Sequence, residues 1–144
     1  LEALPLPAGD SSGGAVAIDT EQIVGWSEDD RGRRRAVVWQ VPNGAFVATA
    51  LPEPDGYSSS STALGTSGRR IVGVCQGSSQ TDVASVVWAA DEPSDRWHLE
   101  FLLDPLPAGP SLPEIATVAA ISGNLAVGSS GLGYPATAVA WRLQ

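Results

Sequence analysis

The chain has no lysine, no methionine, one cysteine and one histidine among its 144 residues. Without lysine, neither a Schiff base nor a Walker-type phosphate loop can form. Cys75 alone cannot make an internal disulfide. One histidine and one distant cysteine cannot supply the three or four ligands that zinc requires. The sequence therefore predicts no metal site and no cofactor.

Basic residues are also scarce, since 8 arginines face 16 acidic residues and the net charge is −8. This charge argues against nucleic acid or an anionic membrane as the partner, because both attract a positive surface. The longest largely apolar run, residues 115–121, is too short to span a bilayer. A chain of this length fits one domain with a real core.

Three landmarks recur in the same order along the chain: a Leu/Pro turn, an apolar-Val-Gly step, and an apolar run that ends in tryptophan. The turns are residues 4–9, 51–56 and 104–109; the glycines are Gly25, Gly73 and Gly128; the tryptophans are Trp39, Trp88 and Trp141. We interpret residues 1–144 as a single repeat domain with three units, approximately residues 5–51, 52–103 and 104–144.

Each unit has short Val-, Ile- and Trp-rich segments bounded by Gly, Pro, Ser and Asp, which is typical of strands. No window has a sustained helical period, so we expect essentially no helix. The expected strands are 15–18, 22–26, 35–41 and 45–51 in the first unit, 61–64, 70–75, 84–89 and 97–102 in the second, and 116–121, 125–129 and 136–143 in the third.

The third unit has only three expected strands, and residues 1–4 precede the first Leu/Pro turn as a fourth strand would. We therefore expect residues 1–4 to complete the last unit beside residues 136–143, of the same chain or of a neighbour. Four-stranded units of this length predict an all-β fold with β-propeller-like blades. Three blades are too few for a propeller, which favours a homo-oligomer or further repeats of a longer chain. A β-trefoil, which would close alone as a monomer, is the alternative.

The repeats resemble those of the HAF-repeat family of bacterial proteins. The matching segments are residues 13–14, 17–19, 23–27 and 35–39 in the first unit, 63–64, 71–75 and 86–88 in the second, and 120–122, 127–130 and 139–141 in the third. The family's signature histidine is replaced by Arg35, Ala84 and Thr137. The resemblance implies propeller-like β repeats in a protein that is extracellular or at the bacterial cell surface, and it brings no catalytic residues.

Few side chains suggest chemistry. Trp26 and Tyr57 are the aromatic residues that the repeat explains least, and they are the candidate binding residues for a glycan or a peptide. His98 lies in a segment that alternates Trp97, Leu99 and Phe101 against His98, Glu100 and Leu102, so we expect His98 and Glu100 on an exposed face. Cys75 takes the place of a serine in the other units and is expected to be a small buried residue. The charged run 28–35 is expected to be a solvated hairpin with local ion pairs.

The residues predict a non-catalytic repeat module with a structural or protein-interaction role, completed by self-association. The first alternative is a carbohydrate- or peptide-binding module that uses loops on one face of a ring. The second is a hydrolase with an acidic pair in a central funnel, which is disfavoured because the sequence has no Gly-x-Ser-x-Gly motif and no metal constellation.

Overall fold

The computed structural model describes residues 1–105, 115–131 and 136–144. These residues form eleven strands and no helix, and hence no helix that could cross a membrane. Sheet 1 has the order β1 (Asp10–Ile18), β2 (Gln22–Asp29), β3 (Arg34–Gln40) and β4 (Val47–Ala50). Sheet 2 has the order β5 (Ser60–Ser67), β6 (Arg70–Gln76), β7 (Val83–Ala90) and β8 (Trp97–Leu103). Sheet 3 has the order β11 (Thr137–Arg142), β10 (Leu125–Ser130) and β9 (Ala116–Ser122).

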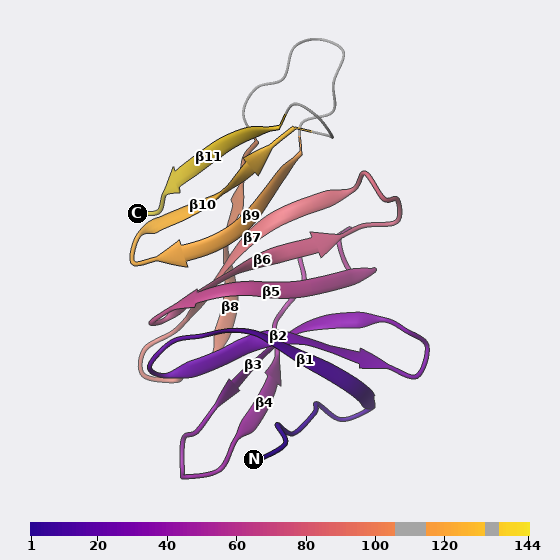
Figure 1. Cartoon of the computed structure of the whole chain (residues 1–144), viewed down its shortest axis with the longest axis vertical. Coiled ribbons are helices and arrows are strands. Elements are labelled where there is room, and N and C mark those ends of the chain that lie inside the picture. The colour runs from indigo at the N-terminus through magenta and orange to yellow at the C-terminus, as the bar shows by residue number, and fades with distance from the viewer. Residues whose placement is uncertain (106–114, 132–135) are drawn as a thin grey trace.

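The three sheets are antiparallel and stack in chain order, with sheet 2 in the middle (Figure 1). One apolar core lies between sheets 1 and 2 and consists of Val24, Ala36, Val38, Leu51, Ala63, Ile71, Cys75, Val86, Trp88 and Trp97. A second core lies between sheets 2 and 3 and consists of Val72, Val87, Leu103, Val118, Ala126 and Leu143. We call the side of a sheet that is turned toward the next sheet its forward face, and the opposite side its backward face. No sheet follows sheet 3 among the described residues, so its forward face is the side turned away from sheet 2.

The all-β repeat fold predicted from the sequence is confirmed, and each of the eleven strands expected between residues 15 and 143 overlaps an observed one. The largest difference is β1, which begins at Asp10 rather than at residue 15. Its first half, Asp-Ser-Ser-Gly-Gly, has the composition of a turn, yet it pairs with β2 because Asp10 is bonded to Ser27 and Arg35. The described residues form no closed barrel, so the trefoil alternative has no counterpart in this structure. The third Leu/Pro turn lies mostly outside the described residues.

The glycine landmark marks a close approach of two backbones. A β carbon added to Gly25, Gly73 or Gly128 would lie 2.0, 2.2 or 2.1 Å from the carbonyl oxygen of Gly14, Thr62 or Thr117, respectively. In all three sheets, this contact lies next to a register shift between the first and second strands. Only glycine fits such a crowded position, which explains why it recurs.

The tryptophan landmark connects the third strand of each sheet to the segment that leads into that sheet. The indole nitrogens of Trp39, Trp88 and Trp141 donate hydrogen bonds to the carbonyl oxygens of Pro5, Pro52 and Asp104, at 2.6, 2.6 and 2.8 Å. Trp39 and Trp88 are fully buried, whereas Trp141 is half-buried. The Leu/Pro segment and the tryptophan are therefore two halves of one repeated contact.

Polar contacts cross both boundaries between sheets. The buried amide of Gln22 in sheet 1 donates to Thr66 Oγ1 in sheet 2 at 2.7 Å. The buried hydroxyl of Ser85 in sheet 2 donates to Ala116 O at 2.7 Å and accepts from Val118 N at 2.9 Å in sheet 3. Because a buried polar group is costly when unpaired, these contacts fix how each sheet is placed on the next.

The β-strand alternation expected for the last strand of the second unit is wrong beyond residue 99. Leu99 pairs with Trp88, but Phe101 pairs with Val87, because a register shift inserts Glu100 between them. Trp88 belongs to the first core and Val87 to the second. The shift therefore turns Phe101 toward sheet 3, away from the face that Leu99 shares with Trp97.

Residues 1–4 lie in no strand, and the N-terminus is beside sheet 1, at the opposite end of the stack from β11 (Figure 1). Within one chain, they therefore do not pair with residues 136–143. Their pairing with a neighbouring chain stays a prediction.

Candidate functional site

Trp26 is half-buried on β2 and is already contacted on its ring face. The guanidinium carbon of Arg34 lies 3.8 Å from the ring centroid, which is cation–π stacking. Gly14 on β1 lies close to the same ring, since a β carbon there would be 2.9 Å from it. A sugar or peptide that stacked on Trp26 would have to displace Arg34.

Tyr57 lies between β4 and β5 and is half-buried against the core between sheets 1 and 2. Its backbone nitrogen donates to Pro54 O at 3.0 Å, which closes the second Leu/Pro turn. The ring thus has a packing role in the repeat. A binding role for Tyr57, like that for Trp26, stays a prediction.

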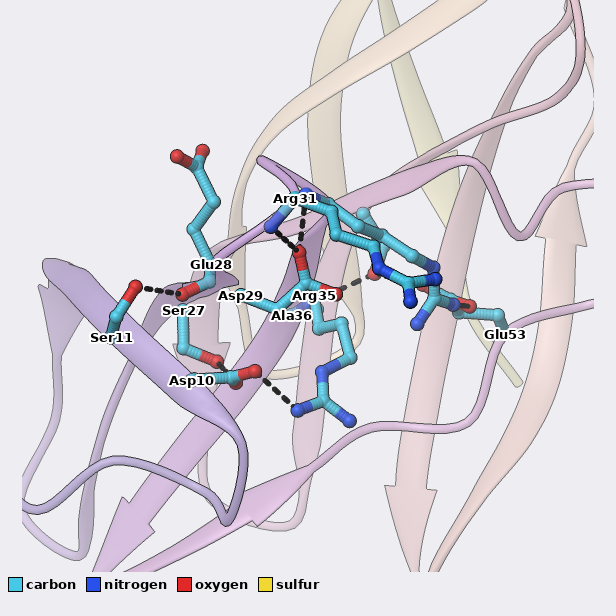
Figure 2. Close-up of polar contacts among 11 residues, drawn as sticks. Asp10, Ser11, Ser27, Glu28, Asp29, Arg31, Arg35, Ala36 and Glu53 are labelled. Atoms are coloured by element: carbon cyan, nitrogen blue, oxygen red, sulfur yellow. Dashed lines mark hydrogen bonds and ion pairs between the residues drawn. The ribbon is translucent and has the colours of Figure 1, made fainter.

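The charged hairpin between β2 and β3 has more distant partners than the sequence suggested. Arg34 does pair locally with Glu28 at 3.5 Å, but Arg35 pairs with Asp10, whose side chain is fully buried (Figure 2). Arg33 reaches Glu53 in the linker to sheet 2, at 2.5 Å. The hairpin therefore connects the start of β1 to the entry of the second unit.

Two side chains continue this polar network. Ser61 donates to Glu53 Oε1 at 2.7 Å and accepts from the backbone nitrogen of Ala36 at 2.9 Å. In the turn of the hairpin, Asp29 Oδ1 accepts from the nitrogens of Arg33 and Arg31, both at 2.9 Å, and the bond from Arg33 in particular lowers the pKa of Asp29. The network holds backbone and carboxylates in place, which is a structural task.

His98 is exposed on β8, as expected, and its Nδ1 lies 3.1 Å from Asp91 Oδ1. Glu100 is half-buried, because both of its oxygens accept from Arg70, each at 2.8 Å. Arg70 also donates to Asn124 Oδ1 at 2.7 Å, in the turn between β9 and β10. Glu100 therefore belongs to a clamp between sheets 2 and 3.

Cys75 is fully buried on the backward face of sheet 2. Burial, with a smaller contribution from the negative charge of Glu53, raises the pKa of its thiol to about 12. Such a thiol stays protonated and unreactive at neutral pH. In the described part of the chain, no three His, Cys, Asp or Glu side chains gather as metal ligands would.

The repeat is irregular on the forward face of sheet 3. Val24, Val72 and Val127 hold the same position in the three sheets, one residue before the close-packed glycine. Val24 and Val72 are 0 % exposed, whereas Val127 is 41 % exposed. Val127 shares an open, mostly apolar surface with Thr117, Ala119, Ser129, Ala138 and Ala140.

A groove runs beside this sheet, between β8 and β11. It has a volume of about 430 Å³ and is lined by Phe101, Leu102, Leu103, Asp104, Ala140, Trp141, Arg142, Leu143 and Gln144. Phe101 is 38 % exposed, and the outer side of β11 has no strand partner among the described residues.

Neither a family model, nor a curated protein, nor a solved structure matches this chain. The assignment of a function therefore depends on the surfaces themselves. Three blades predict uncovered sheet faces at both ends of the arc, but sequence reasoning identified neither the residues of the uncovered forward face nor the groove. The signal was present, because the positions of Val24, Val72 and Val127 align through the glycine landmark. What the sequence lacked was the information that these valines face the next sheet.

Proposed function

We propose that the chain is a non-catalytic repeat module with a structural or protein-interaction role, completed by self-association. The main observation behind this proposal is that Val127 is exposed, whereas Val24 and Val72, which hold the equivalent position in sheets 1 and 2, are completely buried. Apolar surface that two units bury and one leaves open favours association, because burial removes it from water. Among the described residues, no strand pairs with the outer edge of β11, which lies next to that surface and could accept a further strand.

The mass of the protein in solution tests the proposal. Light scattering on the 144-residue chain should give a particle heavier than 14.8 kDa, whose mass falls on dilution. A single species of 14.8 kDa at every concentration would contradict self-association.

The polar network around the charged hairpin supports a non-catalytic role. Its carboxylates are bound by arginines and by backbone nitrogens, and the histidine lies elsewhere, on β8. The alternative of a carbohydrate- or peptide-binding module has less support, since Arg34 stacks on Trp26 and Tyr57 packs against the core. The resemblance to HAF repeats is the basis for proposing a place outside a bacterial cell.

A further inference from the structure

We infer that the chain associates head to tail: sheet 1 of one copy covers the forward face of sheet 3 of another, and residues 1–4 of the first copy add to the outer edge of β11. This inference rests on the proposed self-association and specifies its geometry. The contact would repeat, between two chains, the boundary that each chain already forms twice within itself.

The forward faces support this geometry position by position. The places that Ala36 and Val38 hold in sheet 1 are held by Ser85 and Val87 in sheet 2, and all four are buried. In sheet 3, the same places are held by Ala138 and Ala140, which are exposed. The surface is therefore of the kind that accepts the backward face of another sheet, and small residues leave room for a close approach.

The backward face of sheet 1 is the complementary surface. Ala15 pairs with the close-packed Gly25, as Ala63 pairs with Gly73 in sheet 2. Ala63 is fully buried by sheet 1, whereas Ala15 is exposed. Ile18 is likewise 72 % exposed at the end of β1. Both ends of the stack thus leave open the half of the boundary that is covered inside it.

The position of residues 1–4 follows from the indole contacts. Pro52 accepts the bond from Trp88, and the strand that immediately precedes it, β4, pairs with the third strand of the preceding sheet. Pro5 accepts the equivalent bond from Trp39. Residues 1–4 therefore stand where an outer strand of a preceding sheet would lie. Among the described residues, β11 is the third strand of its sheet and has no partner on its outer edge.

The internal pairing also gives the register. Ala48 lies opposite Trp39 and Ala50 opposite Val37. Leu1 and Ala3 precede Pro5 by four and two residues, as Ala48 and Ala50 precede Pro52. By this equivalence, Leu1 lies opposite Trp141 and Ala3 opposite Val139. The side chain of Leu1 then enters the groove beside Phe101, which is the apolar surface that the outer strand would cover.

The hydrogen-bond direction follows from the same comparison. Leu51 N donates to Ala36 O at 2.9 Å, so alternate residues of β4 point their nitrogens toward β3. By equivalence, the nitrogens of Leu4 and Glu2 point toward β11, and that of Ala3 points away. Ala3 and Val139 then form a non-hydrogen-bonded pair, whose short Cα separation of about 4.5 Å suits a disulfide.

Cross-linking tests the contact directly. In a Cys75→Ser background, one chain carries Ala3→Cys and another carries Val139→Cys. A mixture of the two should form a disulfide-linked heterodimer under mild oxidation, and neither chain should do so alone. Glu2→Cys mixed with Val139→Cys is the control, since residue 2 lies on the other face of the strand.

Association measurements supply the second test. Glu2→Pro removes a donor directed at β11 and should weaken association by about tenfold, the upper range for one net hydrogen bond. Ala3→Pro removes a donor directed away from β11 and should leave association nearly unchanged. Val127→Arg should abolish association, whereas Val47→Arg, at a similarly exposed site on β4, should not. Circular dichroism of each variant at low concentration verifies that the chain is folded.

The outcomes separate the two proposals. If the chain is a monomer at every concentration, both the self-association and its geometry are wrong. If the chain associates but the Ala3–Val139 disulfide fails to form and Glu2→Pro has no effect, the proposed function stands and the head-to-tail geometry is wrong. A cross-link between two Val139→Cys chains would instead indicate a symmetric contact through sheet 3.

Discussion

Trp88→Ala should be among the most destabilising substitutions in the chain. The side chain is 0 % exposed between sheets 1 and 2, and its indole donates to Pro52 O at 2.6 Å. Removing a buried tryptophan ring costs about 3–5 kcal/mol, because the lost burial is compounded by the cavity left behind. Native proteins have a total stability of about 5–15 kcal/mol, so the variant should lose about a fifth of it or more.

Two further variants divide this cost. Trp88→Phe keeps most of the apolar ring and removes the N–H group, so it should cost about 1–3 kcal/mol for the unpaired Pro52 carbonyl. Trp141→Ala deletes the equivalent ring where it is half-buried, and should cost less than Trp88→Ala. Urea denaturation followed by circular dichroism gives the free energy of unfolding. All samples need one protein concentration, because association raises the apparent stability.

The result that would refute the reasoning is a Trp88→Ala protein as stable as the Trp141→Ala protein. Equal losses would mean that burial at the inner boundary does not determine the contribution of this landmark. A neutral Trp88→Ala would mean that the repeat alignment itself is wrong, since the alignment places this ring at the centre of the stack.

Two other predictions concern the glycine landmark and the buried thiol of Cys75. Gly73→Ala places a β carbon 2.2 Å from Thr62 O and should lower the free energy of unfolding, measured by urea denaturation, by about 2–3 kcal/mol or more. Gly68→Ala is the control, because nothing lies within 4 Å of the added β carbon, and it should cost less despite the positive φ of Gly68. Equal costs would contradict the close approach at Gly73. Cys75 should resist iodoacetamide at pH 8 in the folded protein and react on unfolding, and rapid labelling of the native protein would contradict its burial. The pKa of the Cys75 thiol is about 12 in the folded protein and ordinarily 9.0. The buried, protonated thiol therefore contributes fully to stability below pH 9.0, and this contribution is lost as the pH rises toward 12. Cys75→Ser should reduce that loss.

The repeat allowed most of the fold to be predicted from the sequence. The glycine and tryptophan landmarks fall on the second and third strands of each sheet, where spacing varies by only a residue or two. The first half of β1 was missed because its composition is that of a turn, and its pairing depends on Asp10 meeting Arg35, a contact between residues 25 positions apart. Local pattern holds no information on such a contact.

The candidate surface was less predictable for a related reason. The alternation rule placed Phe101 with Leu99, and a one-residue shift at Glu100 moved it to the other face. A register shift of this kind depends on the partner strand and on the Arg70 clamp. The orientation of Trp26 likewise depends on Arg34 across the hairpin.

The division of the apolar interior into two separate cores has a consequence for how the molecule loses structure. Among the described residues, the two cores join each sheet only to its immediate neighbours, as in a linear array of coupled units. Sheet 3 contributes to the second core alone, whereas sheet 2 contributes to both. Sheet 3 can therefore unfold while the core between sheets 1 and 2 stays intact, and such a partly open chain would expose Val72 and Val87. A partner bound to the forward face of sheet 3 would stabilise the sheet that can unfold while the rest of the array stays folded.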